Sequence, residues 1–256
     1  MILRVTVCEL PDAGEPSFDA AWEALRTHLH RQRSDLVLLP EMPFAPWFAR
    51  DREYREDVWR DAVRAHERWC ERLHELRAPV VAVSAPRSEG TQRLNVALLW
   101  QPTRLEPVHV KSYLPDETGY WEASWYHAGP GRFEPARVGD VNVGFQICTD
   151  LWSLGDAQRL GKAGVQLLLV PRATPRGSVD KWLAGGRTAG VVAGAFCLSS
   201  NRADHGDGLF GGLGWITDPE GAVRCTTSPT APFQTVVIDL SESDAAKRTY
   251  PRYALP

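Results

Sequence analysis

Residues 141–152 read Val-Asn-Val-Gly-Phe-Gln-Ile-Cys-Thr-Asp-Leu-Trp, a largely apolar run that ends in a cysteine followed at once by polar residues. With Gly139 upstream and helix-starting residues downstream, this pattern predicts a buried strand that delivers Cys148 to a turn. A thiol near the positive end of the following helix is expected to have a lowered pKa, which would make it a nucleophile. Free cysteines are also among the most buried residues, so this segment alone leaves packing as the commoner role for Cys148.

Two other short apolar runs end in charged residues. Residues 35–41 (DLVLLPE) are stopped by a proline, which places Glu41 just past the carboxyl end of a second buried strand. The following residues 42–48 (MPFAPWF) are apolar and aromatic, so we expect a partly desolvated carboxylate suited to general-base chemistry. Residues 107–111 (PVHVK) predict another short strand ending at Lys111. Taken singly, a loop glutamate and a strand-end lysine usually face solvent.

The rest of the chain alternates between strand-like and helix-like patterns. Strands are predicted at 2–8, 79–84 and 94–100, with a hairpin-type turn at 89–92 between the last two. Apolar residues at helical spacing predict helices at 18–31, with Ser17 as a cap, and at 52–76. This pattern indicates an α/β fold. Because open α/β sheets gather their ligands at the carboxyl ends of parallel strands, Glu41, Lys111 and Cys148 are expected to meet at one rim.

Composition bounds the class of protein. The chain has 256 residues, of which 43% are hydrophobic and 24% charged, enough for one large core. No apolar stretch approaches the roughly 18 residues of a membrane span, and the first residues lack a leader-like pattern, so we expect a soluble, cytoplasmic protein that binds no membrane. A net charge of −3 without a basic, aromatic-interleaved stripe disfavours nucleic acid as a partner. The five widely spaced cysteines suggest neither a disulfide framework nor a metal site.

A carboxylate, an ammonium and a thiol brought together can perform one specific reaction. A thiolate attacks an electrophilic carbon, a glutamate takes the thiol proton and passes it to the departing nitrogen, and an ammonium stabilises the charge that develops on oxygen. This chemistry requires no metal and no cofactor, and a small molecule is the expected partner. A papain-like Cys–His enzyme would need His127 or His205, but the order and flanks of these residues do not fit such a protease.

The ordered set of LLPE at 38–41, HVK at 109–111 and QICTDLW at 146–152 resembles the nitrilase, or carbon–nitrogen hydrolase, superfamily. The triad of that superfamily is a Glu, a Lys and a Cys in this order. The resemblance extends over nearly the whole chain, and the further matching segments lie at 115–129, 165–174, 182–202 and 210–221.

This resemblance implies an α-β-β-α sandwich of two mixed sheets, a single domain over residues 1–256, and a homodimer or higher homo-oligomer. It assigns Glu41, Lys111 and Cys148 to catalysis through an acyl-enzyme, with Lys111 and the backbone N–H of Thr149 as the oxyanion site. A second glutamate that orients the substrate is carried onto Glu122, and Glu117 is the alternative for that position.

The substrate class follows less directly. True nitrilases usually have Trp-Glu after the cysteine, whereas this chain has Thr149-Asp150, which favours a linear amide or N-carbamoyl amine with release of ammonia. An organic nitrile as substrate, or a non-catalytic binding protein of the same fold, remains the alternative. The substrate pocket would be lined by aromatic and cationic residues: Trp47, Tyr120, Trp125, Trp152 and Arg172, with Arg176 as a second cation. For each aromatic residue the alternative role is ordinary core packing, and for each arginine it is exposure to solvent.

Overall fold

The computed structural model describes residues 1–204 and 208–255. Its strands form two sheets. The first has the order β12-β1-β2-β3-β4-β5, in which β1, β2 and β3 run parallel and the other three strands pair antiparallel. Its strands are β1 (Ile2–Leu10), β2 (Leu36–Leu38), β3 (Val80–Glu89), β4 (Gln92–Gln101), β5 (Arg104–Val110) and β12 (Phe233–Asp239).

The second sheet has the order β6-β7-β8-β9-β10-β11, with a parallel centre of β7, β8 and β9. Its strands are β6 (Ala136–Val138), β7 (Val141–Phe145), β8 (Leu167–Arg172), β9 (Phe196–Arg202), β10 (Trp215–Thr217) and β11 (Val223–Thr226). The two sheets join where the last residues of β1 pair with the last residues of β9, Glu9 with Asn201 and Leu10 with Arg202. Both parallel centres therefore direct their carboxyl ends towards one rim.

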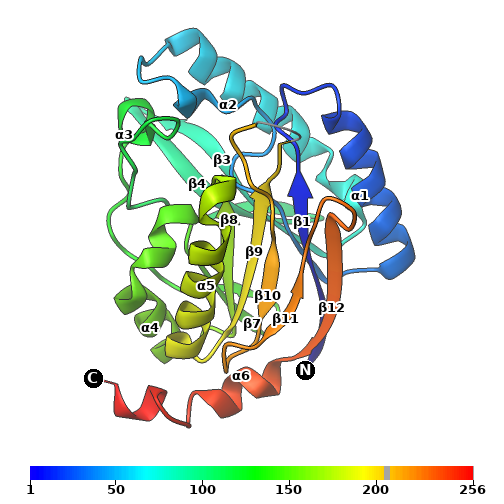
Figure 1. Ribbon diagram of the computed structural model, residues 1–256, viewed down its shortest axis with the longest axis vertical. Helices are drawn as coiled ribbons and strands as arrows, with labels where there is room; N and C mark the ends of the chain where they lie inside the picture. Colours follow the sequence, from blue (N-terminus) through cyan, green and yellow to red (C-terminus); the bar gives the residue numbers. More distant parts are fainter. Residues whose placement is uncertain (205–207, 256) are drawn as a thin grey trace.

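Helices cover the outer faces of both sheets (Figure 1). On the first sheet lie α1 (Phe18–Gln32) and α2 (Glu56–Glu71), and on the second lie α4 (Leu154–Lys162) and α5 (Val179–Ala193). The shorter helices are α3 (Glu122–Trp125) and α6 (Leu240–Ala246), with 3-10 turns η1 (Phe48–Arg50), η2 (Leu73–Leu76), η3 (Cys148–Trp152), η4 (Arg176–Ser178) and η5 (Arg252–Ala254).

The alternation of side chains along the strands builds the layers. In β2, Leu36 and Leu38 pack into the core shared with the second sheet, whereas Val37 packs with α1 residues such as Trp22 and Leu25. A strand buried on both faces is apolar throughout, as the sequence of β2 is. The predicted four-layer α-β-β-α sandwich is confirmed by this arrangement.

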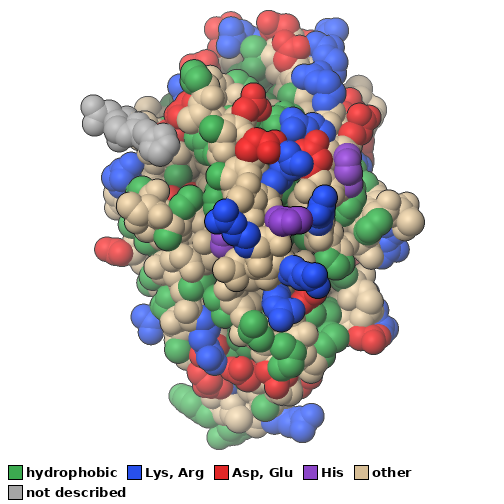
Figure 2. Space-filling model, turned by 90° about the vertical axis from the view of Figure 1, so that its right-hand side faces the viewer, with side chains coloured by type: hydrophobic (Ala, Val, Ile, Leu, Met, Phe, Trp, Pro, Cys, Tyr) green, Lys and Arg blue, Asp and Glu red, His purple; other side chains and the backbone are tan. Residues whose placement is uncertain are grey.

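The predicted elements are present, with shifted limits. The helix predicted at 52–76 begins only at Glu56, because Arg55 has an extended backbone, and its last part is the separate 3-10 turn η2. Ser17 is the residue before α1 but makes no side-chain cap bond; its hydroxyl donates to Glu15 instead. Among the described residues, no helix combines the length and apolar character that a membrane crossing needs. Acidic and basic side chains intermingle on the face shown in Figure 2.

Candidate active site

The structure brings three of the predicted polar side chains into direct contact at the rim of the sheets. The ammonium of Lys111, just past β5, lies 2.8 Å from Oε1 of Glu41, just past β2. It also lies 2.5 Å from Oε2 of Glu122, the first residue of α3. All three side chains are fully buried. Glu117, the alternative to Glu122, is exposed and makes no such contact with Lys111 in the described part of the chain.

Cys148 belongs to the same buried group. The backbone of Ala173, just past β8, lowers the pKa of its thiol, and the backbone N–H of Glu41 donates to the carbonyl of Arg172 at 3.2 Å. The end of β8 therefore holds both Glu41 and Cys148. The charges of Glu41, Lys111 and Glu122 all act on the thiol, which is 3% exposed. Four groups that are far apart along the chain thus share one enclosed site.

The carboxylates each keep one oxygen without a partner. Oε1 of Glu41 accepts from Lys111 and from Nδ2 of Asn95, both at 2.8 Å. Oε2 of Glu122 accepts from Lys111 and from the hydroxyl of Tyr126. Oε2 of Glu41 and Oε1 of Glu122 are buried and have no hydrogen-bond partner among the residues described. Because a buried, unpaired carboxylate oxygen is costly, these two atoms are acceptors available to a bound molecule.

The loop that carries Glu41 is held by a buried arginine that the sequence did not single out for this role. Nε of Arg202, at the end of β9, donates to the carbonyl of Glu41 at 3.0 Å, and Nη2 donates to the carbonyls of Met42 and Ala45. Its remaining Nη1 pairs with Asp12 at 3.0 Å. Met42 has a left-handed backbone, with φ of +43°. The arginine satisfies the carbonyls of a loop that leaves the regular sheet, and so sets the position of the Glu41 side chain.

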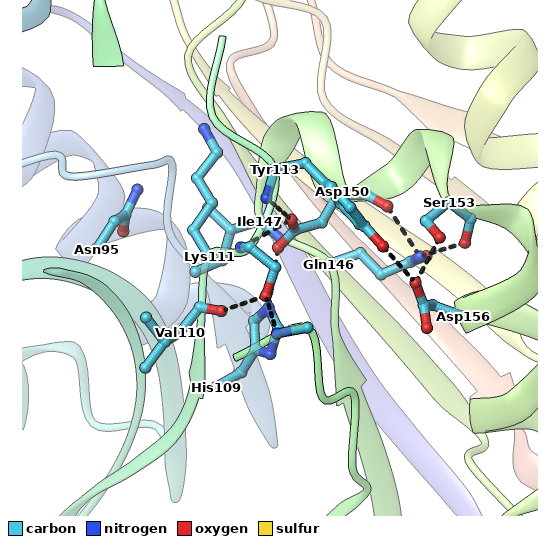
Figure 3. Close-up of polar contacts among 12 residues, drawn as sticks. Asn95, His109, Val110, Lys111, Tyr113, Gln146, Ile147, Asp150, Ser153 and Asp156 are labelled. Atoms are coloured by element: carbon cyan, nitrogen blue, oxygen red, sulfur yellow. Dashed lines mark hydrogen bonds and ion pairs between the residues drawn. The ribbon is translucent and has the colours of Figure 1, made fainter. Parts of the chain in front are cut away.

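The turn that carries Cys148 is held by Asp150 (Figure 3). Oδ2 of this buried carboxylate accepts from the backbone N–H of Ile147 at 3.2 Å. Oδ1 accepts from the backbone N–H groups of Ser112 and Tyr113, the two residues after Lys111, at 3.1 and 3.0 Å. Cys148 itself has φ of +47°, a conformation that side-chain-bearing residues rarely adopt. The Asp150 contacts therefore maintain a strained turn and tie it to the lysine segment.

The thiol does not have the lowered pKa that the sequence suggested. Burial raises the pKa of Cys148 and the Glu41 carboxylate adds to this rise, while Lys111 opposes it. The expectation was wrong because Cys148 begins the short 3-10 turn η3, whereas the regular helix α4 starts only at Leu154. The raised pKa keeps the thiol in its neutral form near neutral pH.

The other two charged groups respond to the same burial in different ways. Burial raises the pKa of Glu122 to about 7, against the attraction of Lys111. Burial by itself would lower the pKa of Lys111, but the carboxylates of Glu122 and Glu41 outweigh it and keep that pKa above its usual value. The lysine therefore remains a cation. Thr149 is the second residue of η3, where a first-turn N–H has no acceptor within the helix.

Two of the residues predicted to line the pocket lie beside the site. The Trp47 ring is buried, donates its N–H to the carbonyl of Gly119 at 2.9 Å, and lies 6.2 Å from the Tyr120 ring. Burial raises the pKa of Tyr120, and ionisation of Cys148 would add to that rise. A surface cleft of about 1020 Å³ borders Trp47, Gly119 and Leu209.

The other predicted pocket residues have different surroundings. Trp125 is fully buried, with its N–H on the carbonyl of Asp51 at 2.6 Å, so it packs inside an aromatic cluster. Trp152 is 40% exposed and lies 4.9 Å from the Trp182 ring. Arg172 is fully buried and donates to Ser199, Thr174 and the carbonyl of Leu213 at 2.6–2.7 Å.

Burial lowers the pKa of Arg172 to about 9, and the guanidinium lies 3.9 Å from the centre of the Trp215 ring. It has no carboxylate partner within ion-pair distance in the part of the chain that the structure describes. The second cation, Arg176, donates to the carbonyl of Asp204 at 3.2 Å. Among residues 1–204 and 208–255, no group of three or more His, Cys, Asp or Glu side chains could hold a metal ion.

The four-layer fold, with a thiol, an ammonium and two carboxylates buried at one rim, is that of the nitrilase superfamily. The family model described as carbon-nitrogen hydrolase matches residues 5–248, and the chain belongs to this family. The resemblance inferred from the sequence is thereby confirmed.

Curated relatives include two kinds of protein. The glutamine-dependent NAD(+) synthetase of Rhodobacter capsulatus is 28% identical over 97% of this chain and 45% of its own length. The N-carbamoylputrescine amidase of Arabidopsis thaliana is 25% identical over 80% of this chain and 75% of its own length. This chain thus spans less than half the length of that synthetase.

Solved structures agree on the fold. A carbon-nitrogen hydrolase from Helicobacter pylori G27 superposes with a TM-score of 0.85, at 18% identity, over 99% of this chain and 95% of that one. An amidase of the nitrilase superfamily from Nesterenkonia superposes with a TM-score of 0.75, at 19% identity, over 98% of this chain and 95% of that one. At these identities the likeness shows the fold alone.

Proposed function

We propose that this protein hydrolyses a linear amide or an N-carbamoyl amine through an acyl-enzyme on Cys148, with release of ammonia. The observation that carries the proposal is the buried contact of Lys111 with both Glu41 and Glu122 beside the thiol. A cation between two carboxylates, enclosed with a nucleophile, is costly to bury and therefore demands a role beyond packing.

In the first half of the reaction, the thiol sulfur attacks the substrate carbonyl carbon while Glu41 takes its proton. The neutral resting thiol fits this coupling, because the base and the attack are needed together. The ammonium of Lys111 and the backbone N–H of Thr149 stabilise the negative charge that forms on the carbonyl oxygen. Glu41 then gives the proton to the substrate nitrogen, the C–N bond breaks, and ammonia leaves a thioester on Cys148.

In the second half, water attacks the thioester carbon and Glu41 takes a proton from that water. The tetrahedral intermediate collapses, the C–S bond breaks, and the proton returns to the sulfur of Cys148. The product is a carboxylic acid, or a carbamic acid if the substrate is an N-carbamoyl amine. Each half uses the same base and the same oxyanion site, so no further group is required.

The unpartnered oxygens favour an amide over a nitrile. Oε2 of Glu41 and Oε1 of Glu122 are both acceptors, and an unsubstituted amide or ureido nitrogen offers two N–H donors. A nitrile nitrogen offers none and would leave both oxygens unpaired. The names of two relatives, a glutamine-dependent synthetase and an N-carbamoylputrescine amidase, both indicate substrates with such a nitrogen.

Substrate contacts are proposed for Tyr120, whose pKa responds to the charge of an ionised Cys148, and for Trp47, which lies beside Tyr120 and borders the surface cleft. Arg172 is the last residue of β8 and would stabilise negative charge on the substrate or on the reacting oxygen. Trp152 is the last residue of η3, which begins at Cys148, and would contact the substrate from that turn. Trp125 contributes to the pocket only by supporting its aromatic wall.

The test is ammonia release from three sets of compounds: primary amides including glutamine, N-carbamoyl amines and amino acids, and nitriles. We expect turnover of the first or second set, and an acyl adduct on Cys148 by mass spectrometry of the intact protein after rapid quenching. Turnover of nitriles alone would favour the nitrilase alternative. Absence of both ammonia and adduct across all three sets would favour the non-catalytic one.

A further inference from the structure

The carboxylate of Glu122 is held by two donors on the same oxygen. Oε2 accepts from the ammonium of Lys111 at 2.5 Å and from the phenol hydroxyl of Tyr126, while Oε1 has no partner among the described residues. Lys111 donates to both carboxylates, Glu41 and Glu122. Of these two carboxylates, the hydroxyl of Tyr126 donates to Glu122 and not to Glu41. Tyr126 therefore distinguishes one carboxylate from the other.

The packing around Tyr126 fixes its hydroxyl in place. The side chain is 2% exposed, and its ring lies 6.4 Å from the Phe48 ring and 6.2 Å from the Trp59 ring. Its backbone N–H donates to the carbonyl of Glu122 at 3.0 Å, at the end of α3. Burial raises the pKa of Tyr126 well above its ordinary value, and the negative charge of Glu122 adds to that rise. The phenol therefore stays protonated and acts as a donor.

We propose that Tyr126 is a positioning residue, whose hydroxyl, together with Lys111, turns Glu122 so that Oε1 faces the substrate nitrogen and favours the ionised form of this carboxyl. The role assumes the proposed amide hydrolysis, because Oε1 must accept an N–H from the substrate. A protonated Glu122 would present a donor there and repel that N–H.

The charged and titratable groups around Glu122 determine how strongly the hydrogen bond from Tyr126 affects the protonation of this carboxyl. They are Lys111, which favours the ionised form, and Glu41, which disfavours it; Cys148 lies beside all three. These opposing influences, with burial, leave Glu122 with a pKa of about 7. A single hydrogen bond to the ionised form therefore decides its charge near neutral pH. Losing one bond to a charged acceptor raises the pKa by about one unit.

The experiment is Tyr126→Phe, which removes the hydroxyl and keeps the ring that packs. The protonation of Glu122 is read from the infrared band of protonated carboxyl groups during a pH titration, and Glu122→Gln assigns that band. We expect a midpoint near 7 in the unaltered protein and about one unit higher in Tyr126→Phe. The kcat/KM for the best amide should fall about tenfold at pH 6 and recover above pH 9.

The matched control is Tyr54→Phe, which removes a phenol–carboxylate bond to Glu56 from the same aromatic cluster but outside the site. This variant should move neither the infrared midpoint nor the pH profile. An unmoved midpoint in Tyr126→Phe, or an equal loss of kcat/KM at every pH, would overturn the proposal. The infrared titration needs no turnover, so a protein that hydrolyses none of the test compounds would refute the proposed function while still testing Tyr126.

Discussion

Nε2 of His109 lies 2.9 Å from Oδ2 of Asp150, and both side chains are buried. This contact joins β5, whose end leads to Lys111, to the turn that carries Cys148. The same carboxylate also accepts the backbone N–H groups of Ser112 and Tyr113. One aspartate, two residues after the thiol, thus determines the separation between the proposed nucleophile and the proposed oxyanion lysine.

The first prediction concerns this link. Asp150→Asn should lower kcat by at least tenfold and the free energy of unfolding by about 2 kcal/mol, because an amide NH₂ would face backbone donors in place of one charged acceptor oxygen. Chemical denaturation and steady-state kinetics measure the two effects. Asp140→Asn, on an exposed side chain that pairs with Arg137 at the protein surface, is the control. Equal losses in the two variants would contradict the role of Asp150.

Cys148→Ala should abolish turnover and leave the fold intact. The substitution removes the sulfur nucleophile and little volume, and the backbone bonds around Asp150 still maintain the turn. Ammonia release measures activity, and circular dichroism with thermal unfolding measures the fold. Activity that survived in this variant would refute the acyl-enzyme mechanism.

Glu41→Gln should reduce kcat by about 10²-fold or more, the usual size of a general-base contribution. The amide preserves the size of the side chain and can keep one acceptor towards Lys111 and Asn95. Single-turnover kinetics would separate the acylation step from the hydrolysis of the thioester, and both should slow. A rate equal to that of the unaltered protein would remove Glu41 from the scheme.

Lys111→Ala should reduce kcat far more than it changes KM, because the ammonium acts on the charge of the transition state. The variant leaves two buried carboxylates without a cation, so we expect a loss of about 3–5 kcal/mol in unfolding free energy at pH 8. That deficit should shrink as the pH is lowered and Glu122, whose pKa is raised by burial, becomes protonated. A change confined to KM would make Lys111 a binding group.

The acid limit of stability should depend on His66. Burial lowers the pKa of this histidine from 6.5 to about 3, and its neutral ring bonds the carbonyl of Ala62 and the backbone N–H of Phe44. Its contribution is therefore complete above pH 6.5 and is lost as the pH falls towards 3. Between pH 7.5 and 5, the stability advantage over His66→Gln should shrink by about 2 kcal/mol. A constant difference in urea unfolding would contradict this.

The residue patterns by themselves predicted an α/β fold and the polar residues at three strand ends, and the family resemblance implied the four layers and Glu122. Largely apolar runs such as 36–39 and 141–147 predict strands, because a strand that is buried on both faces has apolar residues at consecutive positions. Strand ends are equally local, since a proline or a turn stops the apolar run. The order of Glu41, Lys111 and Cys148 along these ends indicated the family, which the match over residues 5–248 confirms.

Only the tertiary structure decided how those groups are held and charged. The sequence around the supporting residues does not reveal their roles. Arg202, Asp12 and Asn95 act on residues that the packing of other elements brings near. Tyr126 reaches Glu122 across one turn of a short helix. The direction of the pKa shift of Cys148 was also predicted wrongly from the sequence. The sequence suggested that a helix end would stabilise the thiolate and lower the pKa, whereas burial raises it. Strand patterns depend on neighbours along the chain, whereas desolvation and charge depend on every group that the folded protein places around an atom.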